Sequence, residues 1–139
     1  MPKTFLIFVI FLGAFLTACQ SASVSGEAVH VNGGSYMNVS AAELRVMLDE
    51  EDLVLVNVHI PFAGNIPNSD LSISDDQIGA PEYLNQLPAQ KDAMIVLYCR
   101  SGRMSEIAAA ELVPLGYTNA WNLEGGMVDW ENAGYEIKP

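Results

Sequence analysis

Two short aliphatic runs constrain the fold of this chain more than any other feature. They cover residues 53–58 and 94–98, and each is nearly continuous rather than alternating with polar residues. A continuous apolar run of this length is typical of a strand buried on both faces of a sheet. Segments with helical patterns separate and follow the runs. The sequence therefore predicts an α/β domain with a mostly parallel sheet covered by helices.

Four segments have the composition and spacing of helices. They cover residues 41–49, 81–87, 104–115 and 127–133. The first opens with a capping box, because Ser40 precedes Glu43 by three residues. Gly116 closes the third, as glycine commonly does at the end of a helix. A last strand is expected over residues 119–123, and no internal repeat is visible.

The first 18 residues have the composition of an export signal. Lys3 precedes an apolar run over residues 5–16. A helix needs ~20 apolar residues to span a bilayer, and this run is shorter. Its length and its positive start match the hydrophobic core of a secretory signal peptide. An uncleaved anchor is the alternative, which the length of the run disfavours.

The end of this run carries a processing motif. Residues 16–19, Leu-Thr-Ala-Cys, resemble the lipobox of bacterial lipoproteins, whose cysteine is acylated and becomes the mature N-terminus. We therefore expect an exported protein, anchored to the bacterial cell envelope through a lipid on Cys19 and facing the periplasm. Gln20 in place of Asp favours the outer membrane in a Gram-negative host. If the leader is cut elsewhere, Cys19 remains a free thiol.

The composition changes again after Cys19. Residues 19–36 are rich in Ser, Gly, Ala and Asn, and they contain an isolated His30. This composition predicts a flexible tether that holds a domain away from a membrane surface. The folded domain is then expected over residues 37–139.

Charge and cysteine content exclude several classes of protein. The chain has 6 Lys and Arg against 17 Asp and Glu, a net charge of -11. Nucleic-acid binding requires clustered cations, so we expect no nucleic-acid partner. Two cysteines are too few for a multi-cysteine metal site. The acidic clusters at 49–52 and 75–76 lack the spacing of a calcium loop, so we expect neither a metal nor a cofactor.

Cys99 stands out because it directly follows the second aliphatic run and precedes a glycine-containing loop and a helix. Loop amides and a helix N-terminus at such a position stabilise an anion, and they would stabilise a thiolate in the same way. Arg100 and Arg103 lie close by in a chain that has only five cations beyond Lys3. This arrangement indicates a reactive cysteine that attracts an anionic substrate, rather than a structural one.

Three motifs resemble those of one enzyme family. Residues 99–105, Cys-Arg-Ser-Gly-Arg-Met-Ser, resemble the active-site loop of single-domain rhodaneses, which are sulfurtransferases. Residues 123–130, Leu-Glu-Gly-Gly-Met-Val-Asp-Trp, resemble their C-terminal signature, and 64–67 resembles their Gly-His-Ile-Pro segment. The resemblance runs over 37–139. It implies a five-stranded, mostly parallel sheet with helices on both faces.

The same resemblance implies a function. Cys99 would take sulfane sulfur from thiosulfate or a persulfide donor and pass it, as a persulfide, to a thiol or cyanide acceptor. The residues expected to bind the anionic donor and the persulfide are Arg100, Ser101, Gly102, Arg103, Met104 and Ser105. No cofactor is implied. The acceptor is a small thiol or another protein.

Two places depart from the family pattern. Asn57-Val58-His59 stands where rhodaneses usually have Asp-x-Arg, and Asn65 stands where they usually have His. We interpret His59 as polar scaffold; the alternative is a titrating group that tunes Cys99. Trp121 and Trp130 are expected in the core.

Other activities remain as alternatives. Ser105 occupies the position at which related Cys-x5-Arg loops carry their arginine, so the bidentate phosphate clamp of a phosphatase is missing. A non-catalytic module could use the same loop to hold an anion or a partner. An oxidation-sensing thiol is the third possibility, and it would form a stable sulfenate or mixed disulfide without a sulfur donor.

Overall fold

The computed structural model describes residues 24–139. The expected signal peptide over 1–18 and the expected lipidation site, Cys19, lie outside the described residues. Within residues 24–139, no helix is long and apolar enough to cross a bilayer.

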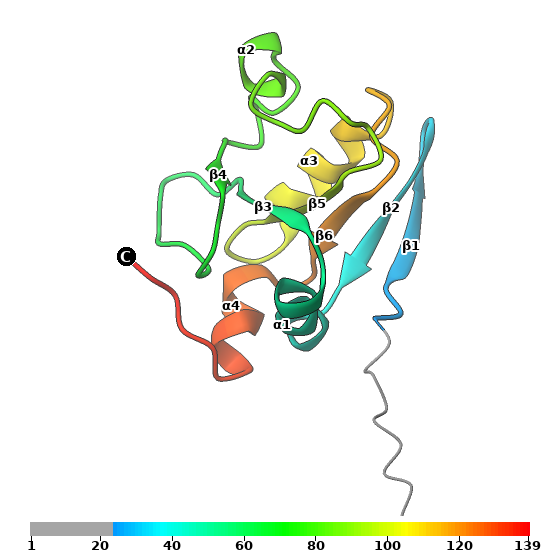
Figure 1. The fold of residues 1–139 in the computed structure, drawn as a ribbon. Helices are drawn as coiled ribbons and strands as arrows, with labels where there is room; N and C mark the ends of the chain where they lie inside the picture. The colour runs from blue at the N-terminus through cyan, green and yellow to red at the C-terminus, as the bar shows by residue number, and fades with distance from the viewer. Residues whose placement is uncertain (1–23) are drawn as a thin grey trace, which may run out of the picture.

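A six-stranded sheet forms the centre of the molecule (Figure 1). Its strands are β1 (Glu27–Val31), β2 (Gly34–Val39), β3 (Leu53–Asn57), β4 (Leu71–Ser72), β5 (Met94–Tyr98) and β6 (Ala120–Leu123). Their order across the sheet is β1-β2-β6-β5-β3-β4. β1 is antiparallel to β2, and all other neighbours are parallel. The predicted α/β fold with a mostly parallel sheet is confirmed, but the expectation of five strands is wrong by one.

Helices cover both faces of this sheet (Figure 1). α1 (Ala41–Glu50) and α4 (Gly126–Asn132) pack together on one face, and α3 (Arg103–Leu112) packs on the other. α2 (Pro81–Leu84) is a short helix in the connection between β4 and β5. Side chains of β5 alternate between the two faces, so Leu97 and Cys99 point to the α3 side and Tyr98 to the α1 and α4 side.

Helix boundaries follow local chemistry. α1 begins with the predicted capping box, in which the Ser40 N–H donates to Glu43 Oε2 at 3.0 Å and the Glu43 N–H donates to Ser40 Oγ at 3.3 Å. α3 ends three residues before the predicted 115, because Pro114 has no N–H to continue the helix. α2 also ends earlier than predicted, at Leu84.

The prediction of a flexible tether over 19–36 is wrong for its second half. β1 and β2 form a hairpin whose turn contains Asn32 and Gly33, with a φ of 92° at Gly33. An Asn-Gly pair is a strong hairpin signal because its residues tolerate positive φ. Apolar side chains of the hairpin pack toward α3, and Tyr36 is buried there. The folded part of the chain therefore begins before residue 37.

Candidate active site

Cys99 lies where β5 gives way to a tight loop and then to α3. Gly102 caps α3 with a φ of 98°, a conformation that favours glycine. This turn brings the Gly102 N–H to Cys99 Sγ at 3.1 Å. Cys99 is only 1% exposed, so its sulfur faces the loop and not open solvent.

Ser105 supplies a second polar contact to the sulfur. Its hydroxyl is fully buried and lies 3.5 Å from Cys99 Sγ and 2.9 Å from the Gly102 carbonyl oxygen. A hydroxyl has one proton, so Ser105 donates to only one of these acceptors at a time. The structure thus joins Cys99, Gly102 and Ser105, three of the seven site residues predicted from sequence.

Further amides of the loop have no acceptor within the described part of the chain. They belong to Arg100, Ser101, Arg103, Met104 and Ser105, the last three in the first turn of α3. N–H groups in a first helical turn lack an intrahelical partner. Successive free amides of this kind form an anion-binding nest beside the sulfur.

The carbonyl groups of the loop are held from the other side by α4. The Met127 N–H donates to the Cys99 carbonyl oxygen at 2.9 Å, and the Val128 N–H donates to that of Arg100 at 3.0 Å. Gly126 permits this approach: a Cβ on it would overlap the Cys99 and Arg100 carbonyl groups. Sequence reasoning recognised the Glu-Gly-Gly-Met motif but did not give it this role.

Arg100 and Arg103 are exposed beside the loop. The single ion pair found within residues 24–139 joins Arg45 to Asp49, so neither arginine is paired with a carboxylate there. Both guanidinium groups are therefore available to an anion. A planar guanidinium binds oxyanions through paired N–H donors.

The two departures from the family pattern form one neutral contact. Asn57 Nδ2 donates to Asn65 Oδ1 at 2.9 Å and to the Gly64 carbonyl oxygen at 2.9 Å. Asn57 Oδ1 accepts from the His59 N–H at 3.0 Å. These contacts fix the segment after β3 without using any charge.

Tyr98 extends this network below the loop. Its hydroxyl donates to Asn65 Oδ1 at 3.2 Å, accepts from the Ile66 N–H at 3.0 Å, and lies 2.7 Å from Ser69 Oγ. Burial raises the pKa of Tyr98 above its ordinary value, and the bonds from Ser69 and Ile66 partly offset this rise. Sequence reasoning placed Tyr98 in the core and missed its hydroxyl, although a buried tyrosine usually has a polar partner.

His59 contacts the scaffold but not the sulfur. Its backbone N–H bonds Asn57, and its buried Nδ1 has no hydrogen-bond partner within residues 24–139. No hydrogen bond joins its ring to Cys99, so the contacts support the scaffold interpretation. Elsewhere, Trp130 is buried as expected, Trp121 is half-buried, and His30 is exposed on β1. Among the described residues, no three His, Cys, Asp or Glu side chains form a metal-binding group.

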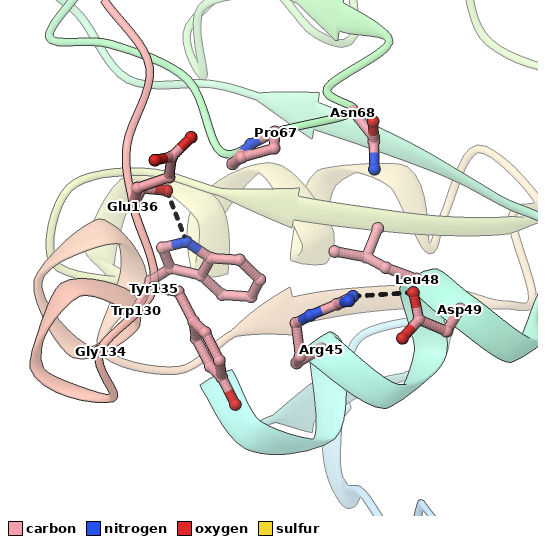
Figure 2. Close-up of a pocket in the computed structure, with 9 residues that line it drawn as sticks. All are labelled: Arg45, Leu48, Asp49, Pro67, Asn68, Trp130, Gly134, Tyr135 and Glu136. Carbon is pink, nitrogen blue, oxygen red and sulfur yellow. Dashed lines mark hydrogen bonds and ion pairs between the residues drawn. The ribbon is translucent and has the colours of Figure 1, made fainter.

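A separate groove of about 410 Å³ lies between α1 and the C-terminal segment (Figure 2). It is lined by Arg45, Leu48, Asp49, Pro67, Asn68, Trp130, Gly134, Tyr135 and Glu136. The Trp130 indole donates to the Glu136 carbonyl oxygen at 3.0 Å and closes its floor. No residue of the Cys99 loop lines this groove, so it is distinct from the candidate active site.

Comparison with known proteins agrees with this geometry. A solved rhodanese-like domain protein from Staphylococcus aureus is 32% identical, with a TM-score of 0.60 over 73% of this chain and 98% of that one. A rhodanese-related protein from Thermoplasma volcanium is 26% identical, with a TM-score of 0.61 over 72% of this chain and 95% of that one. The tRNA uridine(34) hydroxylase of Escherichia coli is 29% identical over 106 residues, which are 71% of this chain but only 29% of that protein.

The family is shown by the extent of the match. Residues 40–133 match the rhodanese-like domain family, and this range contains β3 to β6, the Cys99 loop and α4. The strands, loop and helix that position Cys99 are thus the shared part of the sequence. The chain belongs to the rhodanese-like domain family.

Proposed function

We propose that this protein is a sulfurtransferase in which Cys99 carries sulfane sulfur as a persulfide. The observation that carries the proposal is the position of the sulfur. Cys99 Sγ accepts an N–H bond at the start of α3 and lies beside a nest of amides without acceptors among residues 24–139. Such a site stabilises a thiolate, which is the nucleophilic form of cysteine.

The reaction has two displacement steps. The Cys99 thiolate attacks the outer sulfur of thiosulfate; the new S–S bond forms as the old one breaks, and sulfite leaves with the bonding electron pair. An acceptor thiolate or cyanide then attacks the terminal sulfur of the persulfide, and the Cys99 thiolate leaves. Electrons balance without a cofactor, and ping-pong kinetics are expected.

The surrounding residues suit a small anionic donor. Arg100 and Arg103 would orient the sulfonate oxygens, and the amides from Arg100 to Ser105 would hold the charge that develops on the terminal sulfur. Because Cys99 is 1% exposed, a narrow donor that approaches end-on fits better than a bulky one.

Thiocyanate formation from thiosulfate and cyanide tests this proposal. The protein should form thiocyanate, and mass spectrometry after thiosulfate loading alone should find one extra sulfur on Cys99. Cys99→Ser should lose both signals, whereas exposed Ser72→Ala, on edge strand β4, should keep them. A folded protein that gains no sulfur and forms no thiocyanate would favour a binding module. A stable sulfenate formed without any donor would favour a redox sensor.

The activity of the tRNA-modifying relatives is not proposed for this chain. It spans less than a third of their length. Its net charge of -11 also opposes contact with a phosphate backbone.

We also propose that the protein is exported and anchored to the cell envelope by a lipid on Cys19, with the domain in the periplasm. The lipobox-like residues 16–19 carry this proposal. The protein should fractionate with membranes, and its N-terminal peptide should carry the mass of acyl chains. Cys19→Ala should release it from the membrane; a membrane-bound Cys19→Ala protein would contradict lipidation.

A further inference from the structure

The direction of β1 determines where the N-terminal segment leaves the fold. Glu27 pairs with Asn38 on antiparallel β2, Asn38 pairs with Asn122 on β6, and Asn122 pairs with Leu97 on β5. Glu27 is therefore level with the last residues of β5, next to Cys99. We call this side of the sheet, with the loops that follow β3, β5 and β6, the Cys99 edge (Figure 1).

The chain is already fixed before β1 begins. The Ser25 N–H and hydroxyl both lie within hydrogen-bond distance of Glu43 Oε1 on α1, at 3.3 and 3.1 Å. Val24 packs against the core between the sheet and α1. Gly26 lies so close to the Trp121 ring that a Cβ would not fit. The exit point is thus held at the Cys99 edge.

Short distances then separate Cys19 from Cys99. Five residue steps lead from Cys19 to Val24, and an extended chain of that length spans at most ~18 Å. Three strand spacings separate β1 from β5, which is about 14 Å across the sheet. A lipid on Cys19 would hold the Cys99 edge close to the bilayer.

Apolar side chains gather at this same edge. Phe62 is 59% exposed and Ile60 43%, both in the loop after β3, and Val128 is 37% exposed on α4 beside Arg100. These are three of the five large apolar side chains exposed within residues 24–139. Leu115, by contrast, follows the end of α3 at the opposite edge. Exposed apolar groups of this kind favour contact with a lipid surface.

We infer that the Cys99 edge faces the lipid surface that holds Cys19, with Phe62, Ile60 and Val128 in contact with it. The inference rests on the proposed lipid anchor and on the proposed sulfur transfer for its consequence. That consequence concerns the sulfur partner: a small molecule can enter the narrow gap, and so can a thiol displayed at the membrane. A large protein in bulk solvent is excluded.

Fluorescence quenching on vesicles tests the orientation. Lipidated protein in a Cys99→Ser background carries a fluorophore on Ser101→Cys at the Cys99 edge or on Asn32→Cys in the opposite β1–β2 turn. Each is reconstituted in phosphatidylcholine vesicles that contain headgroup nitroxide lipid. We expect strong quenching at position 101 and little at 32. A long Gly/Ser insertion between Ser23 and Val24 should remove the difference.

The outcomes separate this inference from the proposed function. Equal quenching at both positions, or stronger quenching at position 32, overturns the orientation even if wild-type vesicles form thiocyanate. The expected quenching pattern supports the orientation even if no thiocyanate forms. An unacylated Cys19 removes the basis of the inference, and mass spectrometry of the same sample reports it.

Discussion

Gly126 is the residue on which the close contact between α4 and the Cys99 loop depends. Its φ is 58°, and a Cβ would overlap the carbonyl groups of Cys99 and Arg100. Left-handed backbone costs a non-glycine residue ~1–2 kcal/mol, and overlap in a packed region adds ~1–3 kcal/mol. Gly126→Ala should therefore lower the free energy of unfolding by about 3 kcal/mol and strongly reduce thiocyanate formation.

Gly134 offers a matched control for this substitution. Its φ is 91°, but a Cβ there meets no atom within 4 Å. Gly134→Ala should lose only the backbone contribution of ~1 kcal/mol and keep its activity. Urea unfolding and the thiocyanate assay measure both effects. Equal losses in the two variants would contradict a role for the α4 contact.

Asn57 differs from the family pattern in a way that its contacts explain. Its Nδ2 donates to two oxygens, Asn65 Oδ1 and the Gly64 carbonyl. Asn57→Asp replaces this donor by an acceptor, so three oxygens face one another. We expect a loss of about 2 kcal/mol in the free energy of unfolding, because buried acceptors lose their partner.

The partner position allows a double-mutant cycle. Asn65→His supplies an N–H donor to the new carboxylate, so the double variant should recover part of the stability lost in Asn57→Asp. Urea unfolding of wild type, both single variants and the double variant gives the coupling free energy. An additive double variant would show that the two positions do not interact directly.

At the scale of elements, α1 joins the N-terminal segment to the sheet through Glu43. The Ser40 N–H and hydroxyl, and then the Ser25 N–H and hydroxyl, bond its carboxylate and lower its pKa to about 2. A carboxyl group with a lowered folded pKa stabilises the fold above its unfolded pKa, 4.5. That contribution is lost as the pH falls from about 4.5 to about 2.

Glu43→Gln measures this contribution because glutamine keeps the shape and the neutral hydrogen bonds of a capping box. The variant should be less stable than wild type at pH 7, and the difference should shrink as the pH falls below 4.5. Urea unfolding at several pH values tests this. A difference that stays constant with pH would show that the carboxylate charge does not contribute.

Elements differed in how far the sequence alone predicted them. The bounds of β5 were predicted correctly, because a continuous apolar run flanked by polar residues has few other structures. β1 and β2 were missed because their polar, glycine-rich composition acquires strand structure only by pairing, β2 with β6 far along the chain. β4 has only two residues and no pattern of its own.

The same distinction holds for the site. Cys99, Gly102 and Ser105 are close in sequence, so a local motif predicted them. The contacts of Asn57, Asn65 and Tyr98, and the α4 amides, join residues far apart in the chain. Only the folded sheet brings those groups together.

At the scale of the whole molecule, the net charge of -11 opposes the approach of an anionic donor, whereas Arg100 and Arg103 attract it locally. The two effects differ in range. The screening length falls from ~30 Å at 0.01 M salt to ~10 Å at 0.1 M, so added salt weakens distant repulsion more than contacts with the two arginines.

The kcat/KM for thiosulfate should therefore rise, on the order of threefold, between these two salt concentrations. Cys99 alkylation by neutral iodoacetamide is the control and should barely change, because no long-range charge acts on that reagent. The double variant Arg100→Gln, Arg103→Gln should have a lower kcat/KM and a larger relative rise with salt, since only the repulsion remains. Steady-state thiocyanate assays measure each value. A fall in wild-type kcat/KM with salt would show instead that attraction by the arginines dominates even at long range.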